Sequence, residues 1–137
     1  MMSRRIAFVA ALAGASLAWS QTTRSVWEGI YSKEQAAKGS GLYQQECAGC
    51  HGTSLTGGES APPLMGGEFL SNWTGLSVGD LYERIRTTMP ATRPGTLNRE
   101  TNAAILAYIL EVNQYPAGEA ALPQQTEIVA GIEIDHG

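Results

Sequence analysis

The chain is poor in residues that bind metal ions, because its 137 residues include only two cysteines and two histidines. A structural zinc site usually needs four such ligands, and here the fourth would have to be His136, one residue from the C-terminus. The carboxylates are scattered, and no group of side chains combines a general acid, a general base and a nucleophile. The composition therefore indicates neither a zinc-stabilised domain nor acid–base catalysis.

Basic residues are also scarce, and none follows Arg99. Once Arg4 and Arg5 are set aside with the leader described below, seven Lys or Arg face thirteen Asp or Glu, a formal charge of −6. This balance argues against nucleic acid or an anionic lipid surface as a partner. It fits an acidic surface that meets a basic patch on a protein, and equally a soluble exported protein.

No apolar run is long enough to span a bilayer, which takes about 20 residues. The longest run, 6–19, follows a basic start and ends in small residues at Ala18 and Ser20. This pattern is typical of a secretory signal peptide, so we expect residues 1–20 to be cleaved and the mature protein to lie in the periplasm without a membrane span. An uncleaved N-terminal anchor is the alternative.

Both cysteines fall in one motif, Cys47-Ala48-Gly49-Cys50-His51. The pattern C-x-x-C-H is the attachment signature of haem c, in which two thiols bond the porphyrin and the adjoining imidazole binds iron. At the end of a helix, these three side chains stand at i, i+3 and i+4 and project from one face. A thioredoxin-like redox pair would need a βαβ pattern, which is absent, and a simple disulfide would leave His51 unexplained.

Capping residues predict three main helices. Ser32 begins a helix that runs to about 47–50, Ser77 begins one that ends before Met89-Pro90, and Asn98 begins one that ends near 113. Residues 21–31 form a polar lead-in expected to be coil, and the Gly- and Pro-rich stretch 52–75 is expected to be a long ordered loop. Residues 124–137 are expected to be a flexible acidic tail. The domain would therefore span 32–123.

From about residue 32 to 123 the chain resembles a small class I cytochrome c. Gly39 and Tyr43, eight and four residues before Cys47, match positions that cross Ile105 and Tyr108 on the last helix. The resemblance implies an all-α cytochrome c fold, with three main helices wrapped around one covalently attached haem and long loops between them.

The resemblance also implies further residues that bind the haem. Met89, in its Met-Pro context after the middle helix, resembles the sixth iron ligand, and Met65 and His136 are alternatives. The carbonyl of Pro62 matches the position that accepts a hydrogen bond from the ligand histidine, with Pro63 as an adjacent alternative. Trp73 resembles an indole that donates to a haem propionate. Arg86 and Arg93 are possible partners of the propionates, or solvated surface residues.

These features predict a periplasmic electron carrier with His/Met axial ligation, and no enzyme activity of its own. Short stretches, 26–31, 35–36 and 73–75, resemble cytochrome subunits that accept electrons from pyrroloquinoline-quinone alcohol dehydrogenases. Such a dehydrogenase would be the electron donor, and a terminal oxidase or another cytochrome the acceptor. The alternatives are a haem enzyme or gas sensor with an open sixth position, and an electron-accepting subunit of a quinoprotein dehydrogenase complex.

Overall fold

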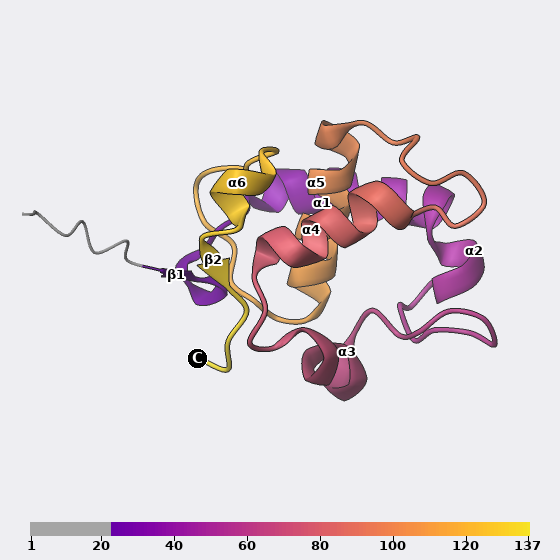
Figure 1. The fold of residues 1–137 in the computed structure, drawn as a ribbon, viewed down its shortest axis with the longest axis horizontal. Coiled ribbons are helices and arrows are strands. Elements are labelled where there is room, and N and C mark those ends of the chain that lie inside the picture. Colours follow the sequence, from indigo (N-terminus) through magenta and orange to yellow (C-terminus); the bar gives the residue numbers. More distant parts are fainter. Residues whose placement is uncertain (1–22) are drawn as a thin grey trace, which may run out of the picture.

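A computed structural model describes residues 23–137, so the expected signal peptide lies outside the described residues (Figure 1). The described chain is mostly helical. Its elements, in order, are β1 (Arg24–Ser25), the 3-10 helix η1 (Val26–Glu28), α1 (Lys33–Glu46), α2 (Ala48–His51), α3 (Gly66–Trp73), α4 (Val78–Thr88), α5 (Arg99–Val112), α6 (Thr126–Val129) and β2 (Ile132–Glu133). The all-α expectation is confirmed.

The three main helices begin at their predicted caps. The Ser32 side chain accepts a hydrogen bond from the backbone N–H of Gln35, and the Asn98 side chain accepts one from Thr101. Ser77 and Asp80 form a reciprocal capping box at the start of α4. Each cap satisfies an N–H group that has no partner within its helix, which is why a local sequence signal locates these starts well.

Helices α1 and α5 cross at the glycine that the sequence singles out. A Cβ atom on Gly39 would overlap the carbonyl group of Ala104, so the two backbones touch at this point. One turn further along α1, the ring centroid of Tyr43 lies 5.5 Å from that of Tyr108. The predicted helix pairing is confirmed, and it fixes the end of α1 that leads into Cys47.

The stretch 52–75 is not a loop throughout, because α3 occupies its second half. The sequence gives α3 a poor start, Gly66-Gly67, with no side-chain cap at Met65. The helix is instead held by tertiary contacts: Phe69 is 1% exposed, and the side chain of Asn113 accepts a hydrogen bond from the Gly66 N–H at 3.0 Å. These contacts outweigh the low helix propensity of glycine.

The expectation of a flexible tail over 124–137 is wrong, because this segment packs into the fold. Val129, Ile132 and Ile134 are each at most 1% exposed. Strand β2 pairs in parallel with β1 of the lead-in, and Ser77 bridges Glu133 in the antiparallel sense. The acidic residues suggested disorder, but the apolar residues that alternate with them pack against α4 and the lead-in. The lead-in is also not simple coil, because it contains β1 and η1.

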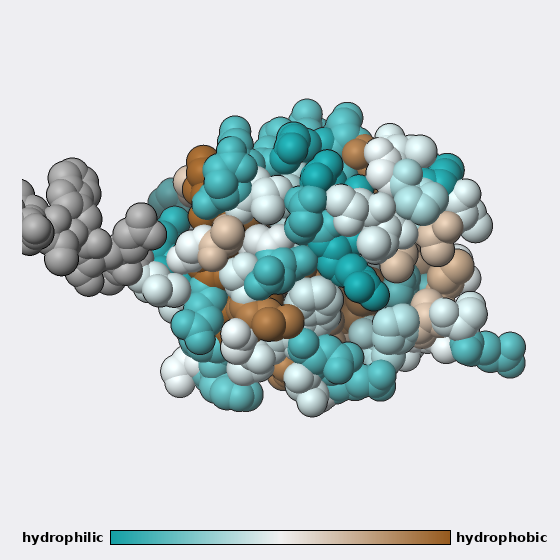
Figure 2. Space-filling view, in the orientation of Figure 1, coloured by the Kyte–Doolittle hydropathy of each residue, from teal (hydrophilic) through white to brown (hydrophobic). Residues whose placement is uncertain are grey.

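The two ends of the described chain lie at one end of the molecule, and α2 lies at the opposite end (Figure 1). The face shown in Figure 2 is largely hydrophilic, with an apolar patch over the segment between α3 and α4, where Leu76 is 45% exposed. Within residues 23–137, the helices are all too short or too polar to cross a membrane.

Candidate functional site

The Cys47–His51 motif forms the short helix α2, which continues from α1 after a bend at Cys47. The backbone N–H of Cys47 still bonds the Tyr43 carbonyl at 2.8 Å, while the His51 N–H bonds the Cys47 carbonyl at 3.0 Å. Gly52 ends the turn with a φ of +85°, a conformation that favours glycine. Both thiols and the imidazole therefore come from a single turn anchored to α1.

The imidazole of His51 is held in one orientation. The side chain is 8% exposed, and its Nδ1 atom lies 2.8 Å from the carbonyl oxygen of Pro62. A donated Nδ1–H leaves Nε2 with a free lone pair, which is the arrangement of a histidine that binds a metal through Nε2. The structure thus places the Pro62 carbonyl where the resemblance requires it.

The segment 52–64, which follows His51, folds back on α2 through hydrogen bonds of its own backbone. The Gly57 N–H bonds the His51 carbonyl at 2.8 Å, and the Leu64 N–H bonds the Leu55 carbonyl at 2.8 Å. The Tyr43 hydroxyl donates to the Gly52 carbonyl at 2.7 Å. Helix α1 and the loop therefore both fix the residues that flank His51.

The two thiols differ in exposure and are not joined by a disulfide in this structure. Burial, reinforced by the neighbouring Glu46 carboxylate, raises the pKa of Cys47 to about 11, while Cys50 is exposed. Within residues 23–137, no three Cys, His, Asp or Glu side chains converge as a metal-ion cluster. The thiols and His51 are therefore not arranged as a closed zinc cage.

The loop that carries Met89 reaches the same end of the molecule as α2 (Figure 1). Met89 is the C-terminal cap of α4, with extended backbone angles (φ −117°, ψ 153°) and a cis bond to Pro90. Four residues later, the Arg93 guanidinium pairs with the carboxylate of Glu46, which directly precedes Cys47. This ion pair ties the loop after Met89 to the start of the Cys47–His51 motif.

The structure gives the other candidates different surroundings. Met65 and Trp73 pack against the hydrophobic core, whereas the half-buried Met89 is not part of that cluster. His136 is exposed and is the residue before the C-terminal one, and the C-terminus lies at the end of the molecule opposite α2 (Figure 1). Arg86 pairs with Glu83, so neither arginine considered for the propionates is without a carboxylate partner in this structure.

Sequence reasoning missed two residues that organise this region. The Asn113 amide donates to the Leu64 carbonyl at 2.9 Å and accepts from the Gly66 N–H, so it holds the chain between Pro62 and α3. Glu46 was not singled out, although it precedes Cys47. The only available signal for Asn113 was its position at the end of a periodic helix, which resembles an ordinary terminus.

A family model described as cytochrome c oxidase, cbb3-type, subunit III, matches residues 34–109. The match runs from the first turn of α1 into α5 and contains both the Cys47–His51 motif and the Met89 loop. The chain belongs to this family of c-type cytochromes. The predicted class I cytochrome c fold is therefore confirmed, and the family implies haem c with its iron as the cofactor and electron transfer as the role.

One solved structure shares the fold of this cytochrome. It is the crystal structure of the sulfane dehydrogenase SoxCD from Paracoccus pantotrophus, in which the matching chain is 23% identical with a TM-score of 0.52. The match covers 85% of the present chain and 62% of the other, so this cytochrome spans less than two thirds of that chain. No curated protein matches the sequence.

The residues present fit a haem c group. A covalently held porphyrin needs two thiols and an adjacent imidazole on one side, with the imidazole presenting Nε2 to the iron. Cys47 and Cys50 lie three positions apart on one turn. The other ring nitrogen of His51, Nδ1, is hydrogen-bonded to the Pro62 carbonyl. The short helix α2 and its N-cap therefore supply the three donor groups that haem c requires on this side.

Proposed function

We propose that this protein is a periplasmic electron carrier with one haem bound covalently through Cys47 and Cys50 and ligated by His51 and Met89. The hydrogen bond between His51 and Pro62 carries the proposal, because a proton on Nδ1 that is donated to the Pro62 carbonyl leaves the lone pair of Nε2 available to bind iron. When bound, the haem iron supplies a one-electron couple between its ferric and ferrous states. The chain holds that group in place and controls what reaches it.

Met89 is the better candidate for the sixth ligand on structural grounds. The pairing of Arg93 with Glu46 holds its loop against the Cys47–His51 motif, while Met65 packs against the hydrophobic core. A thioether is a soft ligand that favours ferrous iron, so His/Met ligation suits an electron carrier. With both axial positions filled, small ligands would have no open coordination site.

The exposed side of the motif indicates where electrons would enter and leave. Gly49 and Cys50 are exposed, whereas Ala48 and His51 are buried. The porphyrin edge bonded to Cys50 would therefore lie near the surface, and a redox partner could approach it there. A dehydrogenase as donor is supported by the fold shared with a chain of a sulfane dehydrogenase and by the quinoprotein-like sequence stretches.

The periplasmic location rests on the leader sequence and on the chemistry of the motif. The first twenty residues have the composition of an export signal. Attachment to haem would also protect both thiols from oxidation in an oxidising compartment. N-terminal sequencing of the protein from the periplasmic fraction should begin at Gln21, and recovery of an intact N-terminus in the membrane fraction would support the anchor alternative instead.

Three measurements on the mature protein test the proposal. Mass spectrometry should find one haem added to the polypeptide, and the Cys50→Ala variant should lose one of its two thioether bonds. The ferric protein should show a thioether-to-iron charge-transfer band that disappears in Met89→Ala and persists in the control Met65→Ala. Rapid binding of carbon monoxide by the ferrous protein would show an open sixth position and would contradict the carrier function.

A further inference from the structure

The segment 124–134, here called the C-terminal clamp, joins the two helices that flank the Met89 loop. The carbonyl oxygen of Gln124 accepts a hydrogen bond from the Tyr82 hydroxyl at 2.9 Å and another from Arg99 Nη1 at 3.2 Å. Tyr82 lies in α4, which ends before Met89, and Arg99 is the first residue of α5, which follows the loop. One carbonyl therefore connects both sides of the loop.

The clamp also crosses the first two turns of α4 in direct contact. A Cβ atom on Gly79 would lie 2.6 Å from the Cα atom of Ala130, so no larger residue fits there without displacement. One turn later, the Thr126 hydroxyl donates to the Glu83 carboxylate at 2.9 Å. Gly79 and Glu83 are four residues apart and lie on the same face of α4, so α6 rests on that face.

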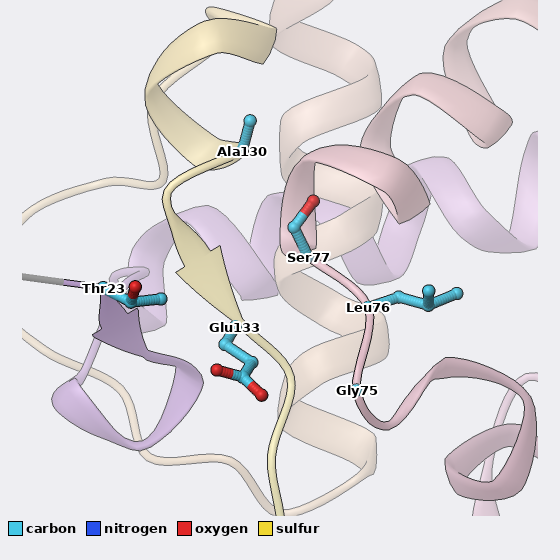
Figure 3. A pocket seen from close by; sticks show the side chains of 6 residues that line it. All are labelled: Thr23, Gly75, Leu76, Ser77, Ala130 and Glu133. Carbon is cyan, nitrogen blue, oxygen red and sulfur yellow. The ribbon is translucent and has the colours of Figure 1, made fainter. Parts of the chain in front are cut away.

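Strand β2 continues the clamp past the N-terminal end of α4. The Gly75 N–H bonds the Ile134 carbonyl at 2.8 Å, and the Ile134 N–H bonds the Leu76 carbonyl at 2.9 Å. Figure 3 shows β2 running between the lead-in and the segment that enters α4, with Ala130 beside Ser77 at the start of that helix. The beginning of α4 is thus held from Gly75 to Glu83.

Held in this way, α4 sets the position of Met89, the cap residue that follows its last turn. The Met89 N–H bonds the Ile85 carbonyl at 3.1 Å, so the hydrogen-bonded helix reaches the methionine itself. At a rise of about 1.5 Å per residue, Met89 lies roughly 9 Å beyond Glu83 along the helix axis. A short helix bends little over this distance, so its anchored first turns determine where the methionine side chain begins.

We propose that the C-terminal clamp is a positioning element for the sixth iron ligand, which keeps Met89 on the iron against competing ligands. This inference rests on the proposed His/Met ligation. The clamp lies outside the part of the chain that matches the family model, which ends at residue 109. Loosening the clamp should let the methionine leave the iron more often without removing any residue that contacts the haem.

Two Gly→Ala variants provide a matched test. In Gly79→Ala, the added methyl group collides with Ala130 and pushes α6 from α4; in Gly41→Ala, the methyl group points into open space on α1. The readouts are the association rate of imidazole with the ferric protein and the intensity of the thioether-to-iron band. Gly79→Ala should raise the rate and weaken the band, and the equilibrium affinity for imidazole should rise at least about fivefold, the lower end of typical coupling between sites. Gly41→Ala should match the parent.

A second variant, Thr126→Val, removes the hydrogen bond to Glu83 with little change in shape, and decides the question if Gly79→Ala does not fold. It should raise the imidazole rate less than Gly79→Ala does. Parent-like imidazole rates and bands in the folded clamp variants, despite lower unfolding free energies, would overturn the inference and leave the clamp a purely stabilising element. Absence of the band in the parent itself would instead overturn the proposed Met89 ligation.

Discussion

Gly39 in α1 and Ala104 in α5 are in backbone contact, with no room for a side chain between them. This contact allows the two longest helices to cross closely, and Tyr43 packs on Tyr108 one turn away. Because α1 leads directly into Cys47, the crossing also determines where the Cys47–His51 motif begins. A change of one methyl group at this point should therefore affect the whole domain.

Replacing Gly39 with alanine should destabilise the protein, although alanine is the better helix former. The new Cβ atom would overlap the Ala104 carbonyl group, and overpacking of this kind costs about 1–3 kcal/mol. The measurement is the free energy of unfolding from denaturant titration. Gly41→Ala, in the same helix but with nothing near its Cβ position, should be neutral or slightly stabilising. Equal stability of the two variants would contradict the close crossing.

Because the C-terminal segment is packed, two of its isoleucines should differ in how much they contribute to the free energy of unfolding. Ile132→Ala should cost about 2–5 kcal/mol, because the side chain is 1% exposed and its removal leaves a cavity. Ile128→Ala, four residues earlier and 52% exposed, should change the unfolding free energy little. Thermal unfolding followed by circular dichroism compares them directly. If Ile132→Ala were as stable as the parent, the segment would be loosely held after all.

The contact between Glu83 and the clamp should stabilise the protein less at acid pH than at neutral pH. Hydrogen bonds from Arg86 and then from Thr126 hold the pKa of this carboxyl below its usual range. A depressed folded-state pKa stabilises the protein above the unfolded value of about 4.3, and this contribution is lost as pH falls through the folded value. The stability difference between the parent and Glu83→Gln should therefore be present at pH 7 and shrink below about pH 4.

Unfolding midpoints for this pair, measured from pH 7 down to pH 3, test that linkage. Glu127→Gln provides a control on the neighbouring helix α6, where the same substitution removes a carboxylate that forms no ion pair among the described residues. A difference between the parent and Glu83→Gln that stayed constant across this range would show that the carboxylate contributes nothing through its charge.

Tyr43→Phe should loosen the turn after His51. The lost hydroxyl donates to the Gly52 carbonyl at 2.7 Å, and a hydrogen bond of this kind is worth about 0.5–1.5 kcal/mol. Tyr108→Phe is the matched control, since it keeps the ring pair and leaves the bond to Gly52 intact. Amide hydrogen exchange at residues 51–57 should increase in Tyr43→Phe alone. Equal exchange in the two variants would show that the hydroxyl does not restrain the turn.

The parts of the fold that the sequence predicted are those specified by neighbouring residues. Ser32, Ser77 and Asn98 each cap the helix that follows. Each side chain accepts a hydrogen bond from the backbone N–H three residues later. The spacing in Cys47–His51 and the glycine eight residues earlier are equally local patterns. Such signals need no knowledge of the rest of the chain, which is why the helix starts and the motif could be located.

The parts that were missed depend on contacts between distant residues. Helix α3 forms despite its glycine start because Asn113, 47 positions from Gly66, supplies the missing partner. The tail was judged by its charge, although Ile132 and Ile134 alternate with acidic residues and face the core. The ion pair between Glu46 and Arg93 likewise joins residues 47 positions apart. No window of the sequence contains both members of these pairs.

The parallel pairing of β1 with β2 places the entry and exit of the described chain side by side, at the end of the molecule away from α2 (Figure 1). The protein can therefore be tethered through its C-terminus, to an electrode or to a fused enzyme, with Cys50 still facing outward. A linker at that terminus would restrain the protein from the end opposite α2, and the surface around the exposed Cys50 would stay accessible to a binding partner.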